Sequence, residues 1–118
     1  MDETSRALLQ SAGIDLEDAL ARFMGSEELL LKFLLLFPED ENYAILKGAM
    51  ENNDLSQAFR AAHSLKGVTG NLSMGPLFRA VCELVEVLRQ GDLAAAADLM
   101  PTVESAYEPI AAALKELR

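Results

Sequence analysis

Residues 55–72 read LSQAFRAAHSLKGVTGNL, and this stretch sets the helical pattern of the chain. Successive residues of an α-helix turn by about 100° around its axis. On that geometry the small and apolar residues gather on one side, and this stripe comprises Ala58, Ala62, Leu65, Thr69 and Leu72. We expect the stripe to face a core. Asn53-Asp54 is predicted to form the preceding turn, with Asp54 as the N-cap of the helix.

A different side of the same helix carries His63, the only histidine of the chain. Six residues fall within about 60° of it, namely Ser56, Phe59, Arg60, Lys66, Gly67 and Gly70. Each glycine in a helix interior costs about 1 kcal/mol relative to alanine, and this helix contains two beside the imidazole. We therefore expect His63 to point outward, with a cation one turn away and open space around it. Such a side chain suits an active site of another protein that must close over it.

The charge of the chain is unevenly distributed. The net charge is −9 with 19 acidic residues, yet residues 55–82 contain no Asp or Glu. Arg60, Lys66 and Arg79 place His63 in a local positive island. A core helix needs few charges, which explains the missing acids but not why the remaining charges are all basic. The overall acidity argues against nucleic acid or an anionic membrane as partner, because both attract a basic face.

The whole pattern predicts an all-α fold. Short helices are expected over residues 3–11 and 16–24. Longer helices are expected over residues 26–52, 55–72 and 75–90, and the first of these is broken at Pro38. A last helical region from Asp92 contains Pro101 and Pro109, so it is expected to be kinked or split. No segment shows the alternation typical of a strand. We predict one domain over residues 1–118, an antiparallel up-and-down four-helix bundle from about 26 to 118, with accessory helices at about 3–24.

Several sequence features indicate where the protein is located and whether it forms oligomers. The apolar run Leu29–Phe37 is too short to span a bilayer and is interpreted as a buried helix. The acidic, polar N-terminus shows no signal peptide, and the lone Cys82 excludes an internal disulfide and fits a reducing compartment. We therefore expect a cytoplasmic location. No signal for oligomers stands out, so a monomer is expected, and the initiating Met with a complete bundle pattern favours a stand-alone protein.

Three kinds of chemistry at His63 have weak support. A metal site needs several ligands, and no second His, Cys pair or nearby acid accompanies His63. A hydrolase needs a nucleophile within reach, but Ser64 points away and Ser56 is two turns distant. Residues 67–71 lack the Lys-Ser or Lys-Thr of a phosphate loop, so no ATP site and no bound cofactor are expected. Nucleophilic attack on an incoming phosphoryl group remains, because neutral imidazole is abundant near pH 7 and Lys66 can neutralise phosphoryl oxygens.

The motif resembles the histidine phosphotransfer (HPt) domains of phosphorelays. The matching segments are residues 62–67 (AHSLKG), 70–72 (GNL), Leu77, 13–15 (GID) and 89–92 (RQGD). The resemblance implies a four-helix bundle with accessory helices, in which His63 is the phosphoacceptor, Lys66 assists the phosphoryl group, and Gly67 and Gly70 keep the approach open. It also implies a phosphocarrier rather than an enzyme. The implied partners are a response-regulator receiver domain, which holds Mg²⁺ and the acceptor aspartate, and a hybrid histidine kinase.

Two positions depart from that family. Ser73 stands where the family often has Gly, so the turn before residue 75 is expected to have another shape. Val85, with Glu86 beside it, stands where the family tends to place a Gln or Glu near the imidazole. The orientation of His63 is therefore expected to depend on another group or on water.

The partner surface is predicted from the residues around His63. Phe59 either packs into the core or forms an exposed apolar rim with Leu77 or Phe78 for the receiver. Ser56 belongs to the same stripe, and Arg60 and Arg79 are expected to steer a negatively charged partner. The alternative function is a helical adaptor that binds a signalling partner without being phosphorylated.

Overall fold

A computed structural model describes residues 1–118 and contains helices only. Seven α-helices and one 3₁₀ turn follow in the order α1 (Glu3–Ala12), α2 (Leu16–Arg22), α3 (Glu27–Leu36), η1 (Phe37–Glu39), α4 (Asn42–Glu51), α5 (Leu55–Asn71), α6 (Gly75–Arg89) and α7 (Leu93–Leu117). The all-α prediction is confirmed. None of these helices combines the length and the apolar character that crossing a membrane requires.

Local hydrogen bonds explain where most helices begin. The side chains of Asp15, Ser26, Asp54 and Asp92 each accept a bond from the backbone N–H three residues later, at the starts of α2, α3, α5 and α7. These bonds satisfy amides that have no partner inside the helix. Asp2 caps α1 in the same way. The predicted break at Pro38 is the 3₁₀ turn η1.

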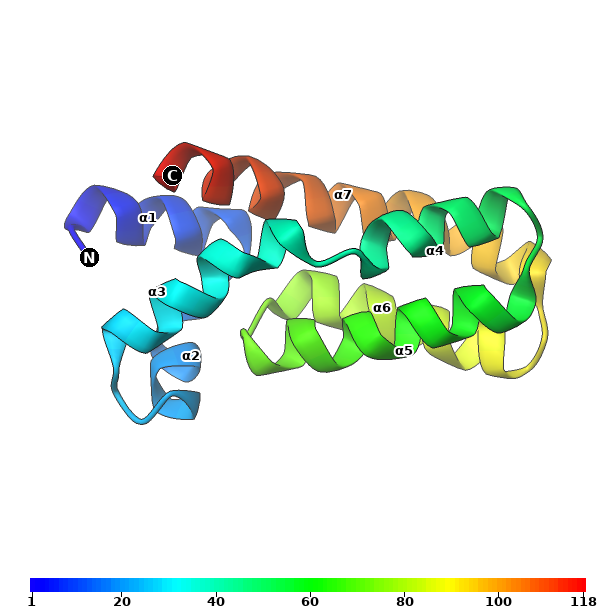
Figure 1. Ribbon diagram of the computed structural model, residues 1–118, viewed down its shortest axis with the longest axis horizontal. Helices are drawn as coiled ribbons and strands as arrows, with labels where there is room; N and C mark the ends of the chain where they lie inside the picture. Colours follow the sequence, from blue (N-terminus) through cyan, green and yellow to red (C-terminus); the bar gives the residue numbers. More distant parts are fainter.

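Helices α4 to α7 form the bundle. Each packs against the next in the chain, and the α4–α5 and α6–α7 turns lie at one end while the α5–α6 turn lies at the other (Figure 1). The predicted antiparallel arrangement is thereby confirmed. Helix α1 lies along the C-terminal part of α7, and α2 and α3 pack at the end where the chain termini lie (Figure 1).

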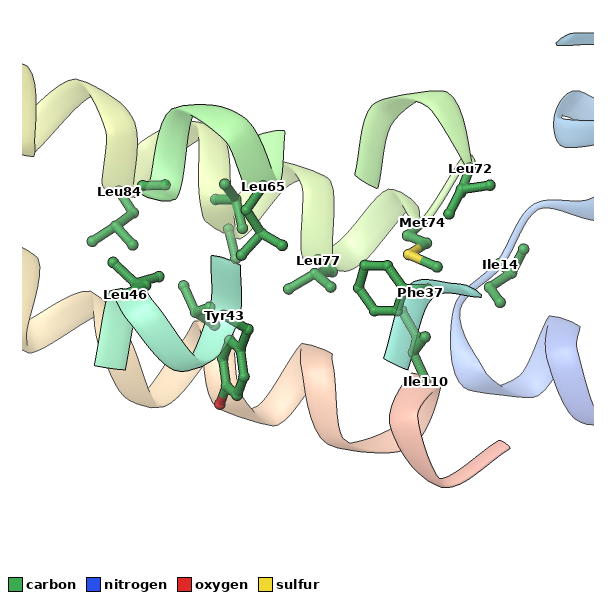
Figure 2. Close-up of a cluster of buried hydrophobic side chains, with 14 of the residues drawn as sticks. Ile14, Phe37, Tyr43, Leu46, Leu65, Leu72, Met74, Leu77, Leu84 and Ile110 are labelled. Atoms are coloured by element: carbon green, nitrogen blue, oxygen red, sulfur yellow. The ribbon is translucent and has the colours of Figure 1, made fainter. Parts of the chain in front are cut away.

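One hydrophobic core joins the bundle to the accessory helices. Figure 2 shows Phe37, Met74 and Ile110 meeting where Ile14 enters from the accessory part of the chain. Leu65 lies among residues from α4 and α6 farther along the bundle (Figure 2). Helix α5, which carries His63, is therefore held by apolar contacts on its inner side along its whole length.

Helices α7 and α2 narrow the predictions made for them. Of the two outcomes expected for the last helical region, a kink or a split, the split does not occur, because α7 runs through Pro101 and Pro109 as one helix. Both prolines are exposed, as are Ala97 and Ser105, whose carbonyls lose their usual donors, so water can hydrate these groups. Helix α2 ends at Arg22, before the left-handed Met24 (φ 57°).

Helix α3 is only half buried, which corrects the interpretation of Leu29–Phe37 as a buried helix. Leu30 and Leu34 are fully buried, whereas Leu29, Phe33 and Leu36 are 42%, 43% and 46% exposed. The physical reason is that α3 meets the core mainly through the stripe of Leu30 and Leu34, while its other apolar residues are only partly covered.

Candidate functional site around His63

His63 lies in the middle of α5 and is exposed to solvent. The predicted inner stripe of α5 is buried at every position, which confirms that the imidazole faces outward. The hydroxyl of the buried Thr69 donates to the Leu65 carbonyl at 2.8 Å, so this polar residue is satisfied within the helix. No residue of the chain forms a hydrogen bond with the imidazole of His63. Both ring nitrogens are therefore open to an incoming group.

An aromatic ring lies against the imidazole. Phe59, one turn before His63, has its ring centroid 5.9 Å from that of the imidazole at an interplanar angle of 25°. Phe59 is half-buried and also packs against the core. The guanidinium of Arg89, at the end of α6, lies 5.2 Å from the Phe59 ring centroid. The expectation that Phe59 packs against the core is therefore confirmed, and its role as a rim for the receiver stays a prediction.

Arg89 is a site residue that the sequence reasoning missed. It lies on another helix, and in the sequence residues 89–92 carry only a family resemblance, with no sign of contact with His63. Its place beside Phe59 follows from the antiparallel packing of α5 on α6, which brings the end of α6 to the beginning of α5. Helix packing, rather than sequence spacing, adds a cation to this side of the site.

The cations of the His63 stripe have no acidic partner. Lys66 is half-buried and forms no ion pair, and Arg60 donates to the Ser56 hydroxyl at 3.0 Å without contacting a carboxylate. An ammonium without a counter-ion next to an exposed imidazole favours the approach of an anion. No group of three or more His, Cys, Asp or Glu side chains is placed to hold a metal ion.

The two glycines of the motif have different surroundings. A Cβ at Gly67 would meet nothing within 4 Å, so this position leaves open surface one turn from His63. A Cβ at Gly70 would lie 3.0 Å from Cε1 of Phe78. Gly70 therefore lets the Phe78 ring pack against α5, and the access to His63 that the motif predicts for this glycine stays a prediction.

The comparison with protein families matches residues 6–117 to the family described as Hpt domain. The chain belongs to the Hpt domain family. Comparison with curated proteins and with solved structures gave no match. Hpt domains carry phosphoryl groups on histidine in two-component relays and have no ATP site of their own. The family assignment thus agrees with the resemblance that the His63 motif predicted.

This Hpt domain has an apolar side chain at the position where a polar group was expected. Val85 is fully buried and belongs to the core. Glu86 beside it is exposed and forms an ion pair with Arg89 at 3.6 Å. Neither residue forms a hydrogen bond with His63, so α6 supplies no polar partner for the imidazole.

Leu77 and Arg79, both on α6, differ in how they fit the predicted partner surface. Leu77 is fully buried, so the prediction that it forms part of an exposed rim is wrong; its position on α6 faces the core together with Val81 and Leu84. Arg79 is exposed, but it lines a shallow groove between α6 and α7 with Glu83 and Thr102. Ser56, Phe59, Arg60 and Lys66 share α5 with His63, whereas Arg79 lies on α6 and its steering role stays a prediction.

Accessory helix α2 is fastened to the turn after α5. The Asp15 amide donates to the Ser73 carbonyl at 3.0 Å, and the Ser73 hydroxyl donates to Asp18 Oδ2 at 2.6 Å. The Ser73 bond, followed by the bond from Arg22, lowers the pKa of the Asp18 carboxyl below its usual range. Ser73 adopts a left-handed backbone (φ 54°), the conformation that glycine favours, so the different turn shape expected from this substitution is not seen at this residue.

An apolar groove of about 510 Å³ opens beside the C-terminal half of α5. Its walls include Phe23 and Phe33, whose ring centroids are 5.5 Å apart, together with Leu36 of α3 and Val68 and Asn71 of α5. The sequence reasoning missed this groove. The signal was present in residues 29–37, which contain more apolar positions than one buried stripe can use.

Proposed function

We propose that this Hpt domain accepts a phosphoryl group on His63 and exchanges it with an aspartate of a response-regulator receiver domain. The observation that supports this is the exposed imidazole, which has no hydrogen-bond partner in the chain and lies beside an unpaired Lys66 and the open surface at Gly67. Neither imidazole nitrogen forms a hydrogen bond within the chain, so one can attack phosphorus while the other carries the proton.

The transfer needs little from the chain beyond position and charge. A bond forms between an imidazole nitrogen and phosphorus as the bond from phosphorus to the aspartate oxygen breaks, and the aspartate leaves as a carboxylate. Lys66 offsets the negative charge of the phosphoryl oxygens. In this proposal Mg²⁺ is held by the receiver, so the Hpt domain contributes nucleophile, cation and access.

We propose that the receiver also covers the apolar groove. Stable partners each bury about 800 Å² at an interface, which extends well beyond one side chain. The groove begins at Val68, five residues after His63, which is about 7.5 Å farther along the helix and about 140° around its axis. A receiver centred on His63 must therefore extend around α5 to cover it. Exposed Phe33 and Leu36 line the groove, and large exposed apolar groups that lie together are typical of an interaction surface.

The first test measures phosphate uptake from a small phosphoramidate donor and from a phosphorylated receiver domain. Wild type is expected to form an acid-labile, base-stable phosphoprotein, and His63→Gln is expected to form none. Lys66→Gln should react more slowly with both donors. A folded wild type that takes phosphate from neither donor contradicts the proposal.

The second test separates docking from chemistry. Phe33→Ser and Leu36→Ser are expected to raise the KM for the phosphorylated receiver about tenfold or more while leaving uptake from the small donor unchanged. Ile45→Ser is the matched control, because Ile45 is also a large exposed apolar residue (37%) but lies on α4 outside the groove. An equal effect of all three substitutions contradicts a role for the groove.

A helical adaptor that is not phosphorylated is the second candidate. The observation that favours it is the buried Val85, because no polar side chain from α6 orients the imidazole. Under this alternative the receiver still binds and the groove substitutions still weaken binding, but His63 takes up no phosphate. The uptake experiment therefore distinguishes the two functions.

A further inference from the structure

The imidazole of His63 has one neighbour that can set its orientation, and that neighbour is aromatic. Its ring lies 5.9 Å from the ring of Phe59 at 25°, while no hydrogen bond from the chain reaches it. Val85, at the position where a polar partner was expected, is fully buried. The stacking partner is therefore the only side chain for which the structure records an interaction with this ring.

Such a contact is able to restrain the ring. Rotation of an imidazole about its last side-chain torsion is broad and only weakly restricted by the backbone. A pair of aromatic rings in contact is worth about 0.5–1.5 kcal/mol beyond the area that it buries. Residues four apart on a helix lie one above the other, so the helix itself brings Phe59 to His63.

Phe59 is itself held in place from two directions. Its side chain packs against the hydrophobic core, and the guanidinium of Arg89 lies 5.2 Å from its ring centroid. Arg89 belongs to α6, so this cation–π contact connects the ring to a second helix of the bundle. A restrained Phe59 presents a fixed surface to the imidazole.

We propose that Phe59 is a positioning residue for His63 in phosphoryl transfer, with Arg89 holding the Phe59 ring. This inference rests on the proposed function. In-line displacement requires the attacking nitrogen to lie opposite the leaving aspartate oxygen, so an imidazole with a restrained ring reacts from a larger fraction of its conformations. Phe59 touches the nucleophile but does not itself exchange electrons or protons.

The test compares Phe59→Leu, which removes the ring and keeps an apolar side chain, with Phe59→Tyr, which keeps the ring. Phe59→Leu is expected to lower the limiting rate of phosphate uptake about two- to tenfold with both the small donor and the phosphorylated receiver. The KM for the receiver should change little, and Phe59→Tyr should retain the wild-type rate. Arg89→Gln should show part of the loss, whereas Lys115→Gln, the same loss of charge at an exposed site on α7, should show none.

NMR of the single histidine provides a readout that does not require transfer. Because His63 is the only histidine, its ring signals are unambiguous. Phe59→Leu is expected to remove the ring-current shift of the His63 signals and to increase motion of the imidazole. Phe59→Tyr is expected to keep the shift and the restricted motion of wild type. Thermal unfolding of each variant shows whether the fold is intact.

The outcomes separate three cases. If Phe59→Leu raises only the KM for the receiver and leaves the small-donor rate and the NMR signals unchanged, Phe59 is a docking residue and the positioning proposal is overturned. If wild type takes up no phosphate, the proposed function fails. In that case the NMR experiment still tests the contact by itself: if the His63 ring signals are the same in Phe59→Leu as in wild type, Phe59 does not restrain the imidazole.

Discussion

The hydroxyl of Ser73 donates a 2.6 Å hydrogen bond to the Asp18 carboxylate, which lies 55 residues earlier in the chain. This bond connects the turn after α5 to accessory helix α2. Arg22 and Phe23, at the end of α2, line the apolar groove beside α5. The position of one wall of the groove relative to His63 therefore depends on a turn residue that departs from the family pattern.

Replacing Ser73 tests the strength of that connection. Ser73→Ala loses the hydrogen bond and keeps the left-handed backbone, so we expect the free energy of unfolding to fall by about 1 kcal/mol. Ser73→Gly loses the same bond but removes a backbone cost of about 1 kcal/mol, so its stability should stay close to that of wild type. Urea denaturation measures both, and a Gly variant less stable than the Ala variant would contradict this account.

The pH dependence of stability should report the same bond. The pKa of Asp18 is lowered in the folded state, first by Ser73 and then by Arg22, so its ionised form stabilises the fold. This stabilisation is present above the ordinary pKa of 3.8 and is lost as the pH falls through the lower folded value. We expect the acid limb of the stability curve to be shallower in Ser73→Ala. Parallel acid limbs in the two proteins would show that Ser73 does not hold the Asp18 pKa down.

Gly67→Ala should separate stability from function. A Cβ at Gly67 meets nothing within 4 Å, and the same holds for Gly48 on α4. Both alanine variants are expected to gain about 0.5–1 kcal/mol in the free energy of unfolding, because alanine is the better helix former. Only Gly67→Ala should slow transfer from a phosphorylated receiver, since its methyl group lies in the approach to His63. Equal transfer rates in the two variants would remove Gly67 from the docking surface.

Gly70→Ala is expected to destabilise the fold. Its Cβ would approach Cε1 of Phe78 to 3.0 Å, so the ring must move, and this overpacking costs about 1–3 kcal/mol against the smaller gain in helix propensity. Thermal unfolding of Gly70→Ala, Phe78→Leu and the double variant measures the coupling. In the double variant the smaller Leu side chain at position 78 is expected to relieve most of the destabilisation that Gly70→Ala causes. If the changes in unfolding free energy of the two single variants simply add up in the double variant, the two positions are not in contact.

Tyr43 carries a buried hydroxyl that has no hydrogen-bond partner. Its ring stacks on Tyr107 at 3.6 Å between centroids, a contact that Tyr43→Phe retains. The substitution removes an unsatisfied polar group, so we expect it to be neutral or to raise the free energy of unfolding by about 1 kcal/mol. A loss of stability in thermal unfolding would show that the hydroxyl is satisfied in solution.

The same hydroxyl predicts how stability changes at alkaline pH. Burial, with a smaller effect of Glu104 and Glu108, raises the pKa of Tyr43 to about 12. The unfolded state loses this proton near pH 10, so stability should fall between pH 10 and about pH 12. Tyr43→Phe is expected to flatten this part of the curve, with the remaining slope coming from groups such as Tyr107, whose pKa is also raised.

The sequence predicted the fold well because its signals are local. Capping residues such as Asp54 bond to amides three residues away, and the inner stripe of α5 follows from helix periodicity alone. The length of α7 was harder to predict, because a proline breaks a helix or is tolerated according to whether water reaches the freed carbonyl. That depends on which face the rest of the molecule leaves exposed.

The candidate site also contains some features that follow from local sequence and others that depend on helix packing. Helix periodicity and the His63 motif alone determine that the imidazole faces outward beside Lys66 and that Gly67 lies next to it, because these residues share one helix. Only the tertiary structure places Arg89 over Phe59, Ser73 against Asp18, and Phe23 and Phe33 beside Val68. These contacts join residues that are distant in the chain. Their geometry depends on how whole helices pack, which the spacing of residues along the sequence does not determine.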